Sequence, residues 1–214
     1  MGIHKHAFDW NAFKGSPTAL NWARRDLTSV DQVLTVVPGR TSCVQAGGNL
    51  GVFPRYLAKH FESVITFEPA QDLFSKMSAN VPDTNVIKIQ AALGDRGGVV
   101  GTACIRRDSK RMAVHEGLTH IVPVGIVPRL RLDALELPVV DLLYLDLEGY
   151  ELYALRGAVE TLARCRPVIA VEINRNIGFE GLTEDDVRTF ITAQGYRPVL
   201  KVRSDEVFVP EERN

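Results

Sequence analysis

The stretch Thr41-Ser-Cys-Val-Gln-Ala-Gly-Gly-Asn-Leu-Gly51 decides the fold of this chain. A short apolar run here ends in a cluster of glycines, and the residues from Val52 to His60 then place apolar side chains at helical spacing. This pattern predicts a strand, a tight turn and a helix. Glycines let a backbone approach a ligand closely and adopt positive φ, and the amides at the start of the next helix favour an anionic group. The stretch therefore predicts a nucleotide-type binding loop.

The kind of nucleotide depends on residues around and after this loop. A Walker phosphate loop needs Gly-Lys-Ser/Thr, which is missing, and the dinucleotide fingerprint needs a glycine where Ala46 stands. A second apolar run, Ser63–Phe67, ends at Glu68-Pro69. An acid that ends the second strand roughly twenty residues past the loop is placed to accept both ribose hydroxyls of an adenosine. Sites for NAD and for S-adenosylmethionine both use this arrangement, so both cofactors stay open at this point.

Composition narrows the class of protein. With 214 residues and 45% hydrophobic content, the chain suffices for one well-packed domain and is short for two. A formal net charge of -1 indicates no nucleic-acid partner. The three cysteines have no CxxC spacing, which favours free thiols in a reducing compartment. Because the sequence shows neither a signal core nor an apolar run long enough for a membrane span, we expect a cytoplasmic protein with no membrane contact.

The order of elements predicts the architecture. Residues 1–25 form an aromatic-rich N-terminal arm that either packs onto the domain or covers the active site, and residues 26–214 form a single domain. We expect helices at Asp26–Leu34, Ala70–Asn80, Tyr150–Leu162 and Leu182–Gln194, and a third strand at Asn85–Ala92. Hairpins are expected at Val99–Ile105 with His120–Val127, and at Tyr196–Val202 with Glu206–Val209. The alternation of strands and helices predicts an α/β, doubly wound, mostly parallel sheet with a β-hairpin insertion.

A second stretch, which carries ionisable side chains at its end, runs from Asp141 to Gly149. Its apolar body predicts a buried strand, and it ends in Asp146 and Glu148 at the edge where open α/β sheets bind ligands. Glu148 also suits a helix cap, whereas buried Asp146 is costly unless it has a function. Asp146 is therefore a candidate site residue. If the reaction at this site removes a proton from a hydroxyl, Asp146 is the first candidate for the base, with Glu148, His115 and His120 as alternatives. A metal held by Asp146, Glu172 and Asn174 is conceivable because oxygen ligands converge there, but the spacing matches no recognised signature and we assign no metal.

Six motifs in order resemble the FkbM family of S-adenosylmethionine-dependent methyltransferases. They are Gln45-Ala-Gly-Gly-Asn-Leu-Gly51, Phe67-Glu68-Pro69, Ala92-Leu-Gly-Asp95, Leu132-Asp133-Ala-Leu135, Asp146-Leu-Glu148-Gly149-Tyr-Glu151 and Leu155-Arg-Gly157-Ala158. The resemblance implies a class I methyltransferase (Rossmann-like) sheet of seven strands with an antiparallel last strand. It also implies S-adenosyl-L-methionine as cofactor and O-methylation of a hydroxyl on a sugar or another small molecule.

Site residues follow from this resemblance by position. Gly47, Asn49 and Gly51 match the loop around the methionine part of the cofactor, Glu68 matches the ribose ligand, and Asp146 and Glu148 match a site pair. Two residues depart from the family pattern, because Gln45 stands in for an acid and Tyr144 for a lysine. Gln45 can still hydrogen-bond the cofactor. From its place at the end of the third strand, Gln90 is a candidate for contact with adenine, as is Asp95.

The sequence also gives expectations for the acceptor, the oligomeric state and alternative functions. The acceptor is a small molecule, either a sugar or, because residues 106–117 are basic, an anionic compound. The sequence leaves a homo-oligomer open. Two other functions stay open as well: a non-catalytic, methyltransferase-like binding module, which would explain Gln45, and a nicotinamide-dependent oxidoreductase, which would leave the Asp146 motif without a role.

Overall fold

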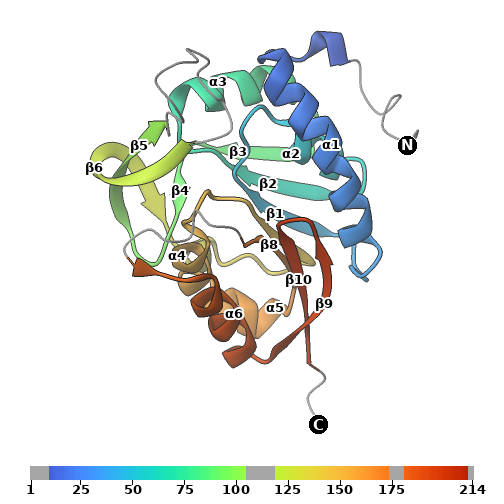
Figure 1. Cartoon of the computed structure of the whole chain (residues 1–214), viewed down its shortest axis with the longest axis vertical. Coiled ribbons are helices and arrows are strands. Elements are labelled where there is room, and N and C mark those ends of the chain that lie inside the picture. The colour runs from blue at the N-terminus through green and yellow to red at the C-terminus, as the bar shows by residue number, and fades with distance from the viewer. Residues whose placement is uncertain (1–9, 105–118, 174–180, 212–214) are drawn as a thin grey trace.

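A seven-stranded sheet forms the centre of the molecule. The computed structural model describes residues 10–104, 119–173 and 181–211, and its main sheet has the strand order β3-β2-β1-β7-β8-β10-β9 (Figure 1). The strands are β1 Ser42–Ala46, β2 Ser63–Phe67, β3 Val86–Ile89, β7 Leu142–Leu145, β8 Val168–Glu172, β9 Tyr196–Val202 and β10 Asp205–Pro210. Strand β10 runs antiparallel to both of its neighbours, whereas the pairs from β3 to β8 are parallel. The predicted doubly wound sheet with an antiparallel last strand is confirmed.

Helices cover both faces of this sheet. They are α1 Pro17–Leu34, α2 Val52–Leu57, α3 Gln71–Asn80, α4 Glu151–Arg156, α5 Val159–Cys165 and α6 Glu184–Ala193, with short 3-10 turns η2 Trp10–Ala12 and η3 Leu132–Leu135. Successive strand residues enter opposite cores, so that Cys43 packs with α1 and α2 while Val44 packs with the layer of α4 to α6. Burial on both faces explains why the strands are continuous apolar runs. Among the described helices, none combines the length and apolar character needed to cross a bilayer.

The expected hairpin insertion is part of a separate small sheet. Strands β4 Ala92–Leu93, β5 Gly98–Cys104 and β6 Thr119–Leu130 pair in the order β4-β6-β5, with β5 and β6 antiparallel. The third strand, expected to be continuous from Asn85 to Ala92, is instead divided between β3 and β4. The amide of Ala91 donates to the carbonyl of Ile89 at 3.1 Å, and this tight turn redirects the chain from one sheet to the other.

The first helix begins earlier than the sequence predicted. We expected it at Asp26, but α1 begins at Pro17 and therefore includes residues assigned to the N-terminal arm. Ser16 caps the helix by accepting a hydrogen bond from the Ala19 amide at 3.2 Å, and proline suits the first turn. The buried residues of α1 start only at Leu27, so the first half shows no apolar period. Because residues 17–26 show no apolar period, the sequence pattern did not predict this half of the helix.

The helix expected at Tyr150–Leu162 is two helices, α4 and α5, with a break at Gly157-Ala158. A Cβ on Gly157 would lie 1.9 Å from the carbonyl oxygen of Gly94. The chain therefore needs a glycine here to pack against the turn after β4, and this contact redirects the helix. Apolar spacing alone did not reveal the break because both segments face the same core.

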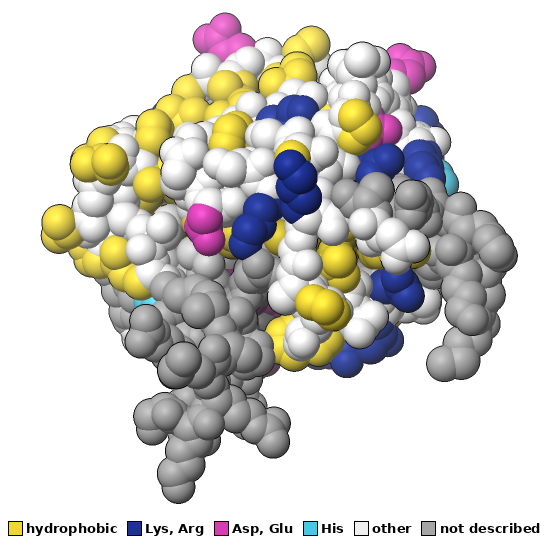
Figure 2. Space-filling view, turned by 90° about the horizontal axis from the view of Figure 1, so that it is seen from above, with side chains coloured by type: hydrophobic (Ala, Val, Ile, Leu, Met, Phe, Trp, Pro, Cys, Tyr) yellow, Lys and Arg dark blue, Asp and Glu magenta, His cyan; other side chains and the backbone are white. Residues whose placement is uncertain are grey.

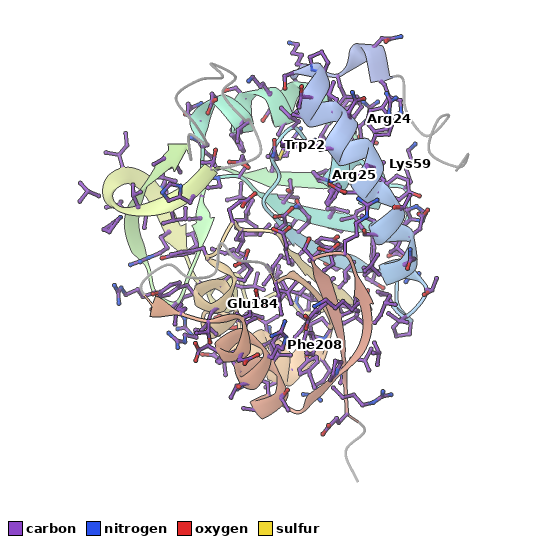
Figure 3. The ribbon with its side chains drawn as sticks, in the orientation of Figure 1. Trp22, Arg24, Arg25, Lys59, Glu184 and Phe208 are labelled. Atoms are coloured by element: carbon purple, nitrogen blue, oxygen red, sulfur yellow. The ribbon has the colours of Figure 1, made fainter. Side chains whose placement is uncertain are left out.

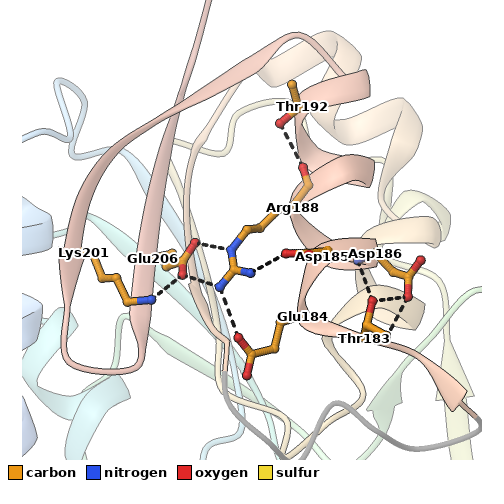
Figure 4. A network of polar contacts seen from close by, with 8 residues as sticks. All are labelled: Thr183, Glu184, Asp185, Asp186, Arg188, Thr192, Lys201 and Glu206. Carbon is orange, nitrogen blue, oxygen red and sulfur yellow. Dashed lines mark hydrogen bonds and ion pairs between the residues drawn. The ribbon is translucent and has the colours of Figure 1, made fainter.

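A charged network fastens α6 to the closing hairpin of β9 and β10 (Figure 4). Glu206 on β10 accepts hydrogen bonds from Arg188 at 2.7 and 2.9 Å and from Lys201 at 2.7 Å. These bonds lower the pKa of the Glu206 carboxyl. Thr183 caps the helix reciprocally with Asp186.

Candidate active site

The candidate site lies where β1, β2 and β7 end. Strands β1 and β7 are neighbours at the point where the connections reverse direction, which is where open α/β sheets bind ligands. The amides of Gly47 and Gly48 donate to the carbonyl of Phe67 at 3.0 and 2.8 Å, and the Asp146 amide donates to the carbonyl of Ala46 at 3.1 Å. These backbone bonds hold the glycine loop between the ends of the other two strands.

Gly47 allows the loop to touch the end of β7. Its φ is 90°, and a Cβ on it would lie 1.9 Å from the carbonyl oxygen of Asp146. Asn49 also has a positive φ of 46°, which asparagine tolerates better than most residues. The loop conformation is therefore set both by φ and by the close approach of β7.

Gly47→Ala is expected to destabilise the protein by about 2 kcal/mol and to reduce cofactor binding, because it adds a methyl group where backbone already stands and strains a positive φ. Gly97→Ala is the matched control, since nothing lies within 4 Å of a Cβ at Gly97. Chemical denaturation of both variants measures the difference. Equal stability of the two variants would contradict the close approach.

Two adjoining cavities meet at this loop. The first has a volume of about 60 Å³ and the second about 220 Å³. Both are lined by Gly47, Asn49, Asp146 and Glu148. The first cavity is further lined by Phe67, Glu68, Pro69, Leu73, Ala91, Ala92, Leu93, Thr119, Ile121, Leu147 and Tyr150. Ligand pockets commonly have several hundred Å³, so the first cavity is narrower than a usual ligand pocket.

Glu68 ends β2 and lines the first cavity with a side chain that is 3% exposed. Its Oε2 accepts a hydrogen bond from the Asn49 amide at 2.7 Å and its Oε1 accepts one from the Ala70 amide at 2.9 Å. Burial raises the pKa of this carboxyl to about 7, although the two amides oppose the shift. Each carboxylate oxygen has lone pairs beyond the one that its amide uses. Glu68 can therefore accept two further donors, such as a pair of ribose hydroxyls.

The place of Gln45 differs from the sequence expectation. Its side chain is fully buried, donates from Nε2 to the carbonyl of Gly47 at 2.9 Å, and accepts at Oε1 from Thr66 Oγ1 at 2.6 Å. It lines neither of the two cavities. The structure therefore assigns Gln45 to supporting the loop from behind. An ionised acid at this position could not donate to the Gly47 carbonyl, and this explains why an amide suits the chain here.

Gly51 and Gln90 also lie outside the lining of both cavities. Gly51 has a φ of 86° and precedes α2, where a Cβ would meet Val81 at 2.5 Å, so its role is structural. Gln90 donates to Gln71 Oε1 at 2.9 Å, while its neighbours Ala91 and Ala92 line the first cavity. Contact of either residue with the cofactor, as we expected from the sequence, does not follow from these positions. Asp95 likewise lies outside the lining.

Three carboxylates gather beyond the glycine loop. Asp146, Glu148 and Glu172 each place an oxygen within 4.8 Å of the others. Burial, followed by the charges of Glu172 and Glu148, raises the pKa of Asp146 well above its usual range. Such a group can take up a proton or hold a cation. Asn174, the other oxygen ligand considered with this group, lies outside the described residues, and we assign no metal.

Tyr144, which stands where the family commonly has lysine, extends this network. Its hydroxyl donates to Asp205 Oδ2 at 2.7 Å. Asp205 stands opposite Glu172 in the antiparallel register of β10 and β8. Burial raises the pKa of Asp205 to about 6, while the Tyr144 hydroxyl opposes the shift. Glu172 Oε1 in turn accepts from Ser204 Oγ at 2.9 Å. The neutral hydroxyls of Tyr144 and Ser204 therefore orient Asp205 and Glu172, whereas a lysine at position 144 would have added a positive charge.

The two histidine candidates have different outcomes. His115 lies outside the described residues, so its role stays a prediction. His120 belongs to β6 and lines neither cavity, whereas its neighbours Thr119 and Ile121 line the first. Side chains of successive strand residues point to opposite faces, and this places His120 on the other side of the small sheet.

Glu151, for which no site role was expected from the sequence, supports the turn after β7. Its Oε1 accepts from the amides of Leu147 and Gly149 at 2.8 and 3.3 Å. Its Oε2 is buried with no hydrogen-bond partner in the described part of the chain, and burial raises its pKa to about 7. Glu151 is the third acid of the motif that begins at Asp146, and this position in the sequence was the signal that could have identified Glu151 as a site residue.

Glu151→Gln is expected to raise the melting temperature at pH 8 more than at pH 5. The folded-state pKa of about 7 lies above the ordinary 4.5, so ionisation of Glu151 costs stability above pH 7 and costs none below pH 4.5. Glutamine keeps the acceptor for both amides and removes the charge, a gain on the order of 3 kcal/mol at most. Thermal melts of this variant and of the exposed control Glu62→Gln test it. An equal effect at both pH values would contradict it.

Helix α1 supplies one wall of the second cavity. This cavity is lined by Ala19, Trp22, Ala23, Arg25, Asp26, Gly48, Leu50, Val52, Phe53 and Glu172 in addition to the four shared residues. The indole of Trp22 extends from α1, and the side chain is 40% exposed (Figure 3). Both alternatives for the N-terminal segment find support in its described part: Phe13 and Trp10 pack onto the core of the domain, whereas Trp22 lines this cavity. The sequence signal for both was the aromatic content of the segment.

Comparison with known proteins identifies the family of this chain. The sequence model of the Methyltransferase FkbM domain matches residues 45–198, which include the glycine loop, Glu68 and the Asp146 motif. The chain belongs to the FkbM methyltransferase family. No curated protein matches the chain significantly in sequence.

Solved structures show the same fold at low sequence identity. The FkbM methyltransferase of Methylobacillus flagellatus KT is 14% identical with a TM-score of 0.52, and the match covers 93% of this chain and 56% of that one. The precorrin-6y C5,15-methyltransferase of Geobacter metallireducens GS-15 is 10% identical with a TM-score of 0.52, covering 98% and 96%. The precorrin 8w decarboxylase of Methanobacterium thermoautotrophicum is 13% identical with a TM-score of 0.51, covering 94% and 98%. This chain therefore spans little more than half the length of the similar FkbM protein.

S-adenosylmethionine is the cofactor of this methyltransferase family, and the residues of the first cavity fit it. Glu68 offers two acceptor oxygens for ribose, and Phe67, Leu73 and Ala91 offer an apolar surface for a base. The Oδ1 atom of Asn49 is buried with no partner among the described residues, and Asn49 lines the cavity. An unsatisfied buried acceptor of this kind is expected where a ligand supplies the donor.

Proposed function

We propose that this FkbM family member transfers a methyl group from S-adenosylmethionine to a hydroxyl of a small molecule, such as a sugar. The observation that carries the proposal is the meeting of two cavities at Asp146, one with Glu68 and one open beneath α1. A methyltransferase needs a donor site and an acceptor site whose reacting atoms are adjacent. The paired cavities supply this arrangement.

The chain's own residues would orient the acceptor and take up its proton. S-adenosylmethionine supplies a methyl carbon already activated by the sulfonium, so the protein contributes mainly position. With the cofactor bound, Glu68 would hold its ribose, and Asp146 would take up the proton of the acceptor hydroxyl as that oxygen receives the methyl group, with S-adenosylhomocysteine as the second product. Burial, followed by the charges of Glu172 and Glu148, raises the pKa of Asp146, and this makes its carboxylate, when ionised, a stronger base.

Calorimetric titration with S-adenosylhomocysteine and with NADH tests the donor site. We expect binding of S-adenosylhomocysteine and none of NADH, because the loop carries Ala46 where a dinucleotide site needs glycine. Binding of neither ligand by a folded protein would favour the non-catalytic binding module. Radiolabelled methyl transfer to a panel of hydroxylated small molecules then tests the reaction itself.

The class of acceptor, the cellular compartment and the oligomeric state are also part of what we propose. A small acceptor is favoured over nucleic acid by the net charge of -1 and by the scattered Lys and Arg side chains on the face in Figure 2. The free thiols of Cys43 and Cys165 support a reducing, cytoplasmic compartment. A homo-oligomer stays a prediction that light scattering can test.

A further inference from the structure

A further cavity lies between the small sheet and α4, and we call it the small-sheet cavity (Figure 1). Its volume is about 140 Å³. Arg96, Arg129, Tyr150 and Tyr153 line it together with apolar side chains of β5 and β6. It shares Ile121 and Tyr150 with the first cavity and no described residue with the second. The small-sheet cavity is therefore separate from the side on which we place the acceptor.

Arg129 is held in this cavity by uncharged partners. Its Nε donates to the carbonyl of Arg96 at 3.0 Å, and its Nη1 donates to the Tyr150 hydroxyl at 3.2 Å. Gly94 leaves room for the half-buried side chain, because a Cβ there would lie 2.6 Å from Cδ of Arg129. Among the described residues, no carboxylate pairs with Arg129 and no acceptor is bonded to its Nη2. The guanidinium is thus oriented, and donors remain available on it.

The hydroxyl of Tyr150 offers another donor beside this guanidinium. A guanidinium only donates hydrogen bonds, so the Tyr150 oxygen accepts in this contact and keeps its own hydrogen. No acceptor for that hydrogen lies among the described residues. The ring is 7% exposed and stacks on Tyr153 with centroids 4.6 Å apart, which fixes the place of the hydroxyl. An oxyanion can accept from both groups at once.

The charge in the small-sheet cavity is positive. Of the described residues that line it, none is an acid. The acid that pairs with Arg96 is Asp95, with Nη1 and Oδ2 3.8 Å apart, and the Arg96 side chain is 73% exposed. Such a long, exposed pair is weak. Even a pair that cancelled the charge of Arg96 in full would leave the positive charge of Arg129.

The other walls of the cavity are apolar. Val100 and Ile121 are buried, whereas Val99 is 58% exposed and gains from contact with an apolar group. We propose that the small-sheet cavity binds a small organic oxyanion, whose carboxylate or phosphate group accepts from Arg129 and Tyr150 and whose apolar part contacts the valines. This site goes beyond the proposed function. It is also distinct from the anionic acceptor expected from residues 106–117, which lie outside the described residues.

Calorimetric titration with matched aromatic compounds tests the inference. Benzoate and phenyl phosphate carry the two kinds of oxyanion, and benzamide is the neutral analogue of benzoate. We expect the better of the two anions to bind at least about tenfold more tightly than benzamide at pH 7, because only the anion makes charge-assisted hydrogen bonds. The anion that binds more tightly identifies whether the site prefers carboxylate or phosphate.

Variants locate this preference in the small-sheet cavity. Arg129→Gln is expected to weaken anion binding by at least about tenfold, and Arg96→Gln and Tyr150→Phe each by at least about threefold. Tyr150→Phe keeps the stacked ring and removes only the hydroxyl. Arg197→Gln removes an exposed arginine on β9 and should leave the affinity within about twofold. Because Arg96 is exposed, its variant stays informative if Arg129→Gln fails to fold.

Two results would overturn the inference. One is equal binding of benzamide and both anions, and the other is an anion preference that survives in Arg96→Gln and in any folded Arg129→Gln. Repeating the titrations on protein saturated with S-adenosylhomocysteine separates the sites: retained anion binding supports the small-sheet cavity, whereas displacement of S-adenosylhomocysteine by the anion would place the anion in the first cavity and overturn the inference. Failure to bind S-adenosylhomocysteine would overturn only the proposed function, since the titrations without it still decide this site.

Discussion

Glu68→Ala is expected to weaken the binding of S-adenosylhomocysteine by at least about a hundredfold. A carboxylate that accepts two ribose hydroxyls makes two charge-assisted hydrogen bonds, each worth roughly 1.5 to 3 kcal/mol. The same carboxylate accepts the amides of Asn49 and Ala70, so its removal also frees the loop that shapes the first cavity. The affinity loss therefore combines a lost ligand contact with a less ordered site. Isothermal titration calorimetry measures it.

Asp72→Ala is the matched control for this change. Asp72 is an exposed acid in the first turn of α3 and lines neither cavity, so its loss should leave the affinity within a few fold. Melting curves of both variants show whether Glu68→Ala still folds. Unchanged affinity in a folded Glu68→Ala variant would remove Glu68 from the cofactor site.

Asp146→Asn is expected to reduce the rate of methyl transfer by ~10²- to 10⁴-fold, which is the usual effect of losing a general base. It should leave the affinity for S-adenosylhomocysteine within a few fold. Because the charges of Glu172 and Glu148 and burial all disfavour a negative Asp146, the amide should also raise the melting temperature at pH 8. A slower but more stable enzyme is the signature of a residue held for chemistry. Single-turnover transfer from labelled cofactor, with melts alongside, measures both effects.

Glu148→Gln gives the comparison for this prediction. It removes the same charge from the same group of carboxylates, but Glu148 belongs to the turn after β7, with a φ of 52°. We expect a smaller loss of rate than for Asp146→Asn. Full activity in Asp146→Asn would remove Asp146 from the mechanism and favour His115 as the base, since His120 lines neither cavity.

Local patterns in the sequence determined the fold, and they identified two acidic site residues that follow the ends of strands. Continuous apolar runs predict strands buried on both faces, and β1, β2 and β7 are such strands. The carboxyl ends of neighbouring parallel strands meet at one edge, so Glu68 and Asp146 could be assigned to the site from the sequence. The same reasoning located the closing hairpin and the insertion, because strand and turn signals are also local.

Only the tertiary structure decided which way the other side chains point and which distant residues meet. Gln45 stands beside the loop in the sequence, yet the packing of β1 against β2 turns its amide toward Thr66 and away from both cavities. Trp22 and Glu172 come from distant parts of the chain and meet at one cavity, which α1 and the end of β8 both line. Strand and helix propensity act over a few residues, whereas such meetings depend on how whole elements pack, and a single sequence does not state this.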